Sequence, residues 1–270
     1  MLNLNFIKDY AREIGIPLNL KKLITEYLQA LILKSISESE FNLNISFRGG
    51  TCLRFVYNNP RFSDDLDFDL VKKGGFNLEK LGLTLKKSLE NYGLVVETNK
   101  IKETAEIYII YVKFTGILYQ AELSGHKDEK MIIKVEIDKN PSSLVKTRIQ
   151  IIDKFNYLYP LLVNDKTTLF AEKLKAVFLR KYTKGRDFFD LIFFLSKPKD
   201  EPNYKILQEK NIIVSNKNEL VLALEKKVKK VKNELITKDV KEYIFNSNQA
   251  NLMENYKEIF AGLKEKYLEK

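Results

Sequence analysis

The 270-residue sequence predicts an α/β protein of the α+β kind, in which a mixed N-terminal part is followed by an all-helical C-terminal part. Short segments rich in β-branched and aromatic residues fill the stretch from residue 93 to residue 138, as strands of a sheet do. After residue 165 the apolar residues recur at helical spacing instead. Asn140-Pro141 ends the last strand. We therefore expect one domain over residues 1–160 and a second over residues 161–270, with the transition between residues 140 and 165.

The elements before residue 93 follow from local patterns. Residues 19–38 place Leu23, Tyr27 and Leu31 on one face of a helix. Residues 42–48 predict a strand or tight turn that runs into two glycines, and residues 65–70 alternate acidic and apolar side chains, as a half-buried strand does. Further helices are expected at 51–57 and 77–91, with a break at Gly74-Gly75 between the strand and the second of them.

The remaining elements form two series. The first is a mainly antiparallel sheet, a meander in its simplest form, with strands expected at 93–101, 106–115, 117–123 and 130–138. The second is a set of helices expected at 167–182, 186–196, 218–233, 236–246 and 249–268, interrupted by a proline-containing loop at 197–202.

Composition excludes several classes of protein. With 44% apolar and 30% charged residues the chain has enough material for a core, so wholesale disorder is excluded. The single cysteine, Cys52, excludes an internal disulfide framework, and the single histidine, His126, excludes a multi-histidine zinc site and argues against a histidine-dependent triad. No apolar run reaches the length of a membrane helix and the first residues lack the layout of a signal peptide, so we expect a cytoplasmic protein without membrane contact.

The charge is unevenly distributed. The chain carries 46 Lys and Arg against 36 Asp and Glu, a net charge of +10, and residues 161–270 hold +7 of it. A basic surface attracts phosphate-rich partners, nucleic acids and nucleotides among them, although a lysine-rich surface also serves solubility alone. The densest basic run is a candidate for binding an RNA backbone as well as an ordinary solvated helix face, and consists of Lys226, Lys227, Lys229, Lys230 and Lys232.

A glycine turn followed by an acidic strand carries the most chemical information. Gly49 and Gly50 allow the backbone to approach a ligand closely and can expose N–H groups at a helix start to phosphate oxygens. Asp65 and Asp67 lie two residues apart, so they share one face of a strand. Two such carboxylates repel each other unless a cation joins them, and Mg²⁺ prefers oxygen ligands and substrate phosphates. The pattern predicts a site for phosphoryl or nucleotidyl transfer.

These residues resemble a known family. One motif resembles the DNA polymerase β-like nucleotidyltransferase superfamily: Gly49-Gly50-Thr51, thirteen further residues, and then Asp65-Leu66-Asp67-Phe68. The sequence of residues 61–68 resembles more narrowly the AbiEii/MenT group of this superfamily, which consists of type IV toxins. A second block, Ala171–Ala176 (AEKLKA) followed by Arg186–Leu191 (RDFFDL), resembles the later helices of that group. The resemblance covers residues 47–191 and implies a small mixed sheet of the polymerase-β-like nucleotidyltransferase fold, closed by a C-terminal helical bundle.

The resemblance also implies roles for individual residues. Gly49, Gly50, Thr51 and Ser63 are expected at the triphosphate of an NTP, with Lys173 neutralising its charge. Asp65 and Asp67 are expected to hold two Mg²⁺ ions, with a third carboxylate on a later strand. Glu136 fits that position because it lies between two apolar residues, and Asp138 on the same face is an alternative. Asp187 is expected as an active-site acid, with Arg186 and Asp190 adjacent to it; the first turns of a helix also favour acids for structural reasons.

The implied reaction is in-line attack of an acceptor hydroxyl on the α-phosphate of an NTP, with release of pyrophosphate. The group implies a toxin with an antitoxin encoded nearby, and an RNA acceptor, of which the tRNA 3′ end is the leading case. Two alternatives remain open from the sequence. One is transfer to a small molecule or a protein hydroxyl; the other is a non-catalytic nucleotide- or nucleic-acid-binding module with the same fold.

Overall fold

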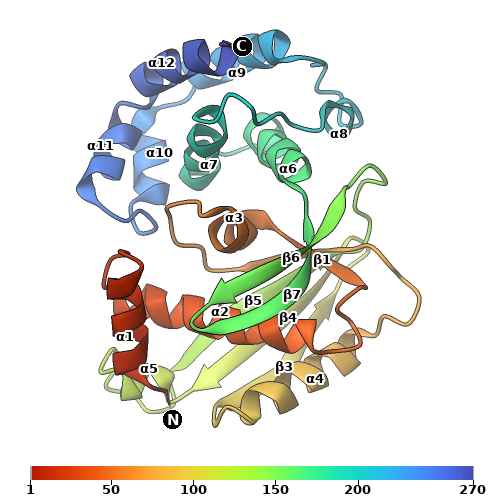
Figure 1. The fold of residues 1–270 in the computed structure, drawn as a ribbon, viewed down its shortest axis with the longest axis vertical. Helices are drawn as coiled ribbons and strands as arrows, with labels where there is room; N and C mark the ends of the chain where they lie inside the picture. The colour runs from red at the N-terminus through yellow and green to blue at the C-terminus, as the bar shows by residue number, and fades with distance from the viewer. Residues whose placement is uncertain (1, 270) are drawn as a thin grey trace. The chain divides into compact units, whose positions relative to one another are not determined.

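The computed structural model of the chain describes residues 2–269, with the side chains of all of them except those at positions 99–101. It divides the chain into two compact units. Unit 1 comprises Met1–Asn58, Phe62–Pro141 and Thr147–Val163, and unit 2 comprises Asn59–Arg61, Ser142–Lys146 and Asn164–Lys270. The mixed sheet and the later run of helices expected from the sequence are both present (Figure 1).

Unit 1 is built on a seven-stranded mixed sheet with the order β3-β4-β5-β2-β1-β7-β6. β3, β4 and β5 form the expected antiparallel meander, whereas β2 runs parallel to β5 and β1 parallel to β7. β1 and β2 pair antiparallel. The strands are β1 (Ile45–Arg48), β2 (Leu66–Leu70), β3 (Val95–Glu103), β4 (Ile107–Thr115), β5 (Lys130–Asp138), β6 (Thr147–Lys154) and β7 (Tyr157–Asn164).

Helix α2 is the most buried helix of unit 1, and it crosses the sheet in Figure 1. The side chain of Asn19 caps its first turn by accepting a hydrogen bond from the Lys22 amide, and Leu23, Leu28 and Leu31 are fully buried along it. It packs against α1 and α4, while α4 also covers β3. The helices of this unit are α1 (Leu4–Glu13), α2 (Leu20–Ser37), α3 (Gly49–Tyr57), α4 (Leu78–Glu90) and the short α5 (Ile117–Gln120).

The expectation of a strand at 117–123 is wrong, because this segment contains α5 and a turn. Gly116 adopts a φ of 79°, which ends β4 and redirects the chain. Ile117 and Leu118 are then both buried, which an alternating strand does not allow but one turn of helix does.

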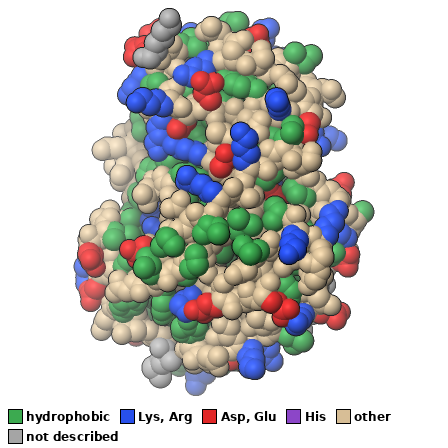
Figure 2. All heavy atoms as spheres, turned by 45° about the vertical axis from the view of Figure 1, so that its right-hand side comes forward, with side chains coloured by type: hydrophobic (Ala, Val, Ile, Leu, Met, Phe, Trp, Pro, Cys, Tyr) green, Lys and Arg blue, Asp and Glu red, His purple; other side chains and the backbone are tan. Residues whose placement is uncertain are grey.

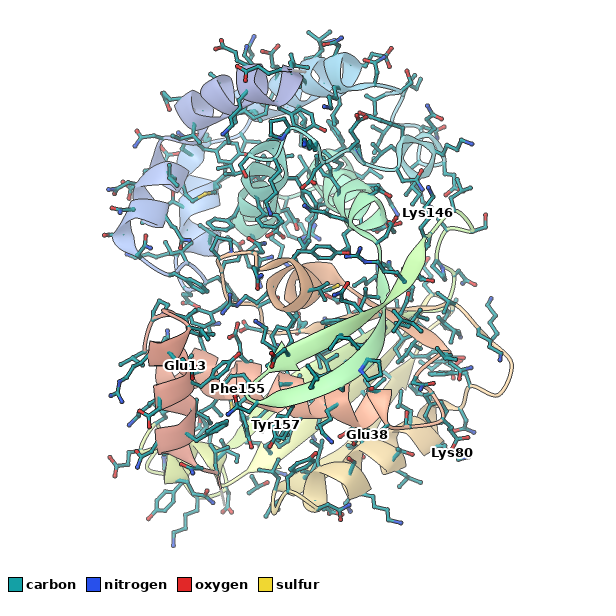
Figure 3. The ribbon with its side chains drawn as sticks, in the orientation of Figure 1. Glu13, Glu38, Lys80, Lys146, Phe155 and Tyr157 are labelled. Carbon is teal, nitrogen blue, oxygen red and sulfur yellow. The ribbon has the colours of Figure 1, made fainter. Side chains whose placement is uncertain are left out.

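The hairpin of β6 and β7 was not expected from the sequence. Its turn places Phe155 and Asn156 at φ values of 53° and 60°, the left-handed pair that a two-residue hairpin turn requires. Phe155 (Figure 3) packs its ring 4.2 Å from that of Tyr10 in α1 and 5.3 Å from that of Tyr27 in α2. Aromatic contacts distant in sequence therefore hold the hairpin against the N-terminal helices.

Unit 2 consists of helices around an aromatic core. The rings of Phe170 in α6 and Phe194 in α7 stack at 4.3 Å. At Gly185, the first residue of α7, a Cβ would overlap the backbone carbonyl of Ile236 in α10, so only glycine permits this approach. The helices are α6 (Lys166–Leu179), α7 (Gly185–Leu195), α8 (Tyr204–Gln208), α9 (Lys217–Lys229), α10 (Asn233–Val240), α11 (Ser247–Glu254) and α12 (Tyr256–Leu268).

Two further properties concern the helices and the charged side chains of the molecule. In the part of the chain that the structure describes, no helix combines the length and the apolarity that a membrane crossing needs. On the face drawn in Figure 2, Lys and Arg side chains alternate with acidic and apolar ones. Although the chain has a net charge of +10, its basic side chains do not cover this face uniformly.

Candidate active site

The glycine turn joins β1 to α3. Gly49 has a φ of 80°, and a Cβ at this position would overlap the Asp67 carboxylate, so the backbone of the turn and this side chain lie in direct contact. Arg48 precedes the helix and makes no capping side-chain hydrogen bond. The first amides of α3 are therefore not capped by that side chain, which leaves them suited to an anion at the positive end of the helix.

Thr51 belongs to the first turn of α3, and Ser63 belongs to the segment that leads into β2. The Thr51 hydroxyl is buried and donates a hydrogen bond of 2.5 Å to the backbone carbonyl of Asp65, which ties α3 to the start of β2. Ser63 is 9% exposed, and its backbone carbonyl accepts a hydrogen bond of 3.0 Å from the Gln29 side chain. Gln29 also donates to the carbonyl of Asp64, so α2 fixes the segment that leads into the acidic strand.

The acidic residues of β2 and β5 meet across the parallel pairing of these strands. Asp67 is paired with Glu136 and Asp69 with Asp138, and both pairs lie on the face opposite Phe68. Asp65, two residues before Asp67, lies on the same side and its side chain is 43% exposed. The register therefore brings the expected acids onto one face of the sheet.

Lys134, which the sequence places on the same strand face as Glu136 and Asp138, lies among these acids. The Lys134 ammonium is 3.0 Å from the carboxylate of Glu136 and 3.8 Å from that of Asp65. Burial lowers the pKa of Lys134, but the hydrogen bond to Glu136 and the charges of Asp65 and Asp67 outweigh burial, so the pKa is raised. Its position agrees with the expectation that residues 134, 136 and 138 share one face of a strand.

Arg48 separates the two candidates for the third carboxylate. Its guanidinium is 2.9 Å from Asp69 and 3.7 Å from Asp138, and Asp69 is only 2% exposed. Asp138 is thus neutralised by an arginine that also anchors a buried acid. Glu136 is the carboxylate paired with Asp67.

The donor set fits Mg²⁺ in its chemistry. Among residues 2–269 no three acidic, histidine or cysteine side chains converge closely enough to hold a metal as they lie. Mg²⁺ commonly binds through one or two carboxylates, with waters and substrate phosphates completing its octahedron. Asp65 and Asp67, with Glu136 adjacent, supply that number of oxygen ligands next to the uncapped start of α3.

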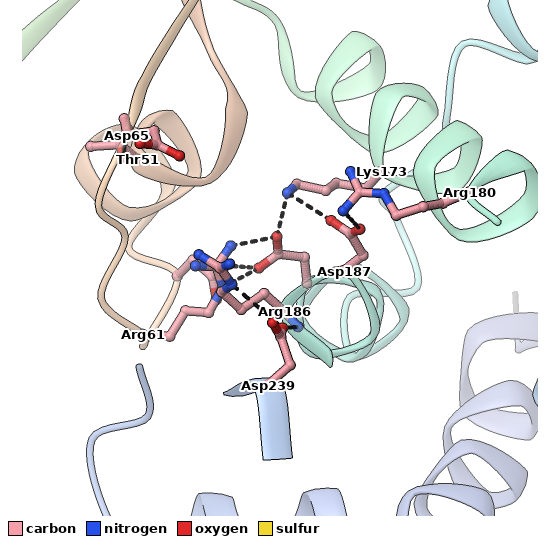
Figure 4. Close-up of polar contacts among 10 residues, drawn as sticks. Thr51, Arg61, Asp65, Lys173, Arg180, Arg186, Asp187 and Asp239 are labelled. Atoms are coloured by element: carbon pink, nitrogen blue, oxygen red, sulfur yellow. Dashed lines mark hydrogen bonds and ion pairs between the residues drawn. The ribbon is translucent and has the colours of Figure 1, made fainter. Parts of the chain in front are cut away.

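A second group of charged residues lies within unit 2 and includes Lys173, Arg180 and Asp187, which are labelled in Figure 4. The Asp190 carboxylate is fully buried and receives Arg61 through two contacts of 2.7 Å. The Lys173 ammonium is also 2.7 Å from it, and the Asn59 amide donates a hydrogen bond of 2.6 Å. Burial raises the pKa of Asp190, but Arg61 and Lys173 outweigh burial and lower it to about 2. Asp190 is thus an ionised anchor whose hydrogen-bonding capacity is used within the protein.

Asp187 has a different environment. Its side chain is 6% exposed and lies 3.4 Å from the Lys173 ammonium and 3.1 Å from the Arg180 guanidinium. It also lines a cavity at the start of α7. Lys173 therefore bridges Asp187 and Asp190, and only Asp187 of the two acids faces a space that a ligand can enter.

Arg186 serves the packing of unit 2. Its backbone amide donates a hydrogen bond of 3.0 Å to the Asp239 carboxylate, and its guanidinium lies 4.1 Å from the ring centroid of Tyr243. Asp239 thereby caps the first turn of α7. Sequence spacing could not have identified Arg61, because its partner Asp190 is 129 residues away.

The chain was compared with known proteins by sequence and by structure. The family model described as nucleotidyl transferase AbiEii toxin, type IV toxin–antitoxin system, matches residues 31–266. No curated protein sequence matches the chain significantly. The fold is similar to that of JHP933 from Helicobacter pylori, with 21% sequence identity and a TM-score of 0.57 over 92% of this chain and 91% of that one. It is also similar to MenT4, a nucleotidyltransferase toxin of Mycobacterium tuberculosis, with 16% identity and a TM-score of 0.59 over 99% and 93% of the two chains.

Proposed function

Because the chain belongs to the family of AbiEii nucleotidyltransferase toxins of type IV toxin–antitoxin systems, we propose that it transfers a nucleoside monophosphate from an NTP to the 3′ end of an RNA, with tRNA as the leading acceptor. Membership in the family implies an NTP substrate and an antitoxin partner. The antitoxin is expected to be encoded next to the toxin. The RNA acceptor and Mg²⁺ are our assignments.

One observation supports the proposal above all others. The Asp67 carboxylate lies against Gly49, at the point where α3 begins without a capping side chain, and on the strand position paired with Glu136. A place for phosphate oxygens and a pair of acids are thus built into the same few residues of unit 1. A module that only binds a phosphate has no use for adjacent carboxylates, because they repel the ligand unless a cation lies between.

In this proposal the glycine turn and the acids of unit 1 have different roles. The amides of Gly50 and Thr51 bind phosphate oxygens, and the Ser63 hydroxyl is assigned a place beside the same phosphates. Asp65 and Asp67 would hold Mg²⁺, with Glu136 as the third carboxylate. When bound, the metal supplies positive charge to the phosphates of the NTP.

In the same proposal Lys173 neutralises charge that develops on the triphosphate. Its ammonium is held by Asp190 at 2.7 Å and by Asp187 at 3.4 Å, so it is positioned before substrate arrives. Asp187 is the active-site acid that shares Lys173 with the buried anchor Asp190.

The test is a labelling experiment. The purified full-length protein is incubated with unfractionated bacterial tRNA, Mg²⁺ and each α-³²P-labelled NTP in turn. We expect label on tRNA with at least one NTP, and roughly 100-fold less with Asp67→Asn, because an oriented charge at the reacting phosphate is lost. Asp128→Asn, which removes an exposed carboxylate on a loop, is the matched control and should label like the unchanged protein.

Each outcome has a defined meaning. If no RNA is labelled with any NTP, the RNA acceptor is wrong, and label on a protein or a small molecule identifies the alternative acceptor. If Asp67→Asn labels tRNA as fast as Asp128→Asn does, the assignment of Asp67 to the site is wrong.

A further inference from the structure

A basic cavity of about 180 Å³ lies within unit 2, where the end of α6, the start of α7 and the second half of α9 meet. Its lining brings together cations that are far apart in the sequence, and a single carboxylate accompanies them. These residues are Arg180, Lys181, Lys184, Lys227, Lys230 and Asp187. Two of the five cations come from the lysine run of α9 for which the proposed transfer reaction has no role.

The single acid does not balance these charges. Asp187 is already shared between Arg180 at 3.1 Å and Lys173 at 3.4 Å. Lys227 donates a hydrogen bond of 3.3 Å to the backbone carbonyl of Phe178, which carries only a partial charge. The cavity therefore retains a surplus of positive charge within a partly enclosed space, where water screens it less than at an open surface.

Lys184 shows this surplus most clearly. Its side chain is half-buried, and in the part of the chain that the structure describes its ammonium makes no hydrogen bond or ion pair. Burial and then the charge of Arg186 lower the pKa of Lys184, against the opposing effect of Asp187. An anion in the cavity would give this ammonium the partner it lacks.

The surroundings favour a chain of phosphates over a single small anion. Lys226 and Lys229 of α9 and Lys232 before α10 continue the positive charge outside the cavity and are exposed. Tyr182, which lines the cavity and is 68% exposed, lies under the Arg180 guanidinium at 5.2 Å from its ring centroid. Exposed aromatic rings next to a basic groove are the usual means of stacking unpaired bases.

We propose that this cavity binds a backbone phosphate of the RNA acceptor, through Lys184, Lys227 and Lys230, while Tyr182 offers its ring to a neighbouring base. The proposal rests on the proposed function, because it takes the acceptor to be RNA. It adds a phosphate-binding role for residues of unit 2 to the roles already proposed for the glycine turn and the acids of unit 1.

The experiment measures binding in the absence of NTP, with the full-length protein and unfractionated bacterial tRNA as the probe. The test variant combines Lys184→Gln with Lys230→Gln, and the matched control combines Lys205→Gln with Lys210→Gln, two exposed lysines of unit 2 that do not line the cavity. Both remove two positive charges. We expect the cavity variant to bind about 10-fold more weakly, with the slope of log K against log salt reduced by about one, whereas the control loses less than about 3-fold.

Three outcomes would overturn the proposal. The first is an equal loss in both variants, which would reduce the effect to net charge. The second is unchanged tRNA binding by the cavity variant. The third is a loss of NTP binding, measured by calorimetry without RNA, that leaves tRNA binding intact, because the phosphate would then belong to the nucleotide. If the double variant melts earlier than the control, Lys230→Gln alone at its exposed position replaces it, with Lys210→Gln as its control.

The test is independent of the transfer reaction. If tRNA binds through the cavity but is never labelled, the proposed transfer fails and the cavity assignment stands. If tRNA is labelled and the cavity variant binds it normally, the cavity assignment fails and the transfer stands.

Discussion

Asp190 concentrates more charge than any other buried position discussed above, because one fully enclosed carboxylate is shared by Arg61, Lys173 and Asn59. Removing one partner from such a group leaves the others buried without compensation. The cluster therefore stabilises unit 2 and fixes the position of the Lys173 ammonium, to which we assign a role at the triphosphate.

At the residue scale, Asp190→Asn should lower the free energy of unfolding by about 3–5 kcal/mol, because the Arg61 and Lys173 charges stay buried. The pKa of Asp190 is about 2, below its ordinary 3.8. The stabilisation is therefore fully present above pH 3.8 and is lost as the pH falls through about 2. Urea denaturation measured across this pH range checks both statements. A loss of less than 1 kcal/mol, or an unchanged pH dependence in the variant, would contradict them.

Also at the residue scale, Glu136→Gln should reduce tRNA labelling roughly 100-fold, whereas Asp138→Asn should reduce it less than 3-fold. The reason is that Glu136 is paired with Asp67, the acid that lies against Gly49, whereas Asp138 is paired with the buried Asp69. Initial labelling rates measured on both variants at saturating Mg²⁺ distinguish the two acids. The reverse order would make Asp138 the third carboxylate.

At the element scale, the β1–α3 turn depends on one glycine. Gly49→Ala should abolish labelling, because its Cβ would displace the Asp67 carboxylate, and should cost about 1–2 kcal/mol of stability through its positive φ. Gly15→Ala is the matched control, since Gly15 has a φ of 68° and nothing within 4 Å of an added Cβ. It should show the strain in a thermal melt and keep its activity. Equal activity of the two variants would separate the turn from the site.

Elements with a strong local pattern could be predicted from the sequence, and those that depend on distant contacts could not. The period-two alternation of β2 and the helical spacing of α2 are properties of their own residues. The β6–β7 hairpin was missed because aromatic contacts to α1 and α2 hold it in place, and α5 was misread because Gly116 changes the chain direction. In the candidate site, the sequence indicated which acids share a face with Lys134, but it did not indicate that Arg61 lies beside Asp190.

At the scale of the whole molecule, the two units are not consecutive pieces of chain. Asn59–Arg61 and Ser142–Lys146 belong to unit 2, although both precede residue 160. The expected division into a nucleotidyltransferase domain over residues 1–160 and a helical domain over residues 161–270 remains a prediction. The physical reason that a linear boundary is difficult to infer is that Arg61 lies only four residues before Asp65 and yet binds within unit 2.

A fragment of residues 161–270 should therefore fold poorly. It retains Asp190 and Lys173 but loses Arg61 and Asn59, and with them most of the hydrogen bonds that satisfy the buried carboxylate. Circular dichroism should show reduced helicity and no cooperative melt, in contrast to the full chain. A fragment that melts at the temperature of the full chain would show that the Arg61–Asp190 pair is dispensable.

The Arg61–Asp190 pair also has an evolutionary consequence. A substitution at either position alone leaves the remaining charge buried without its partner, because the side chain of Arg61 is 2% exposed and that of Asp190 is fully buried. A single substitution therefore lowers the stability of the protein, whatever its effect on catalysis. It is tolerated when the other position changes with it. Across homologous sequences we expect the two positions to be conserved together or exchanged together. Such covariation between positions 61 and 190 would show from sequences alone that residue 61 belongs to the same unit as residue 190.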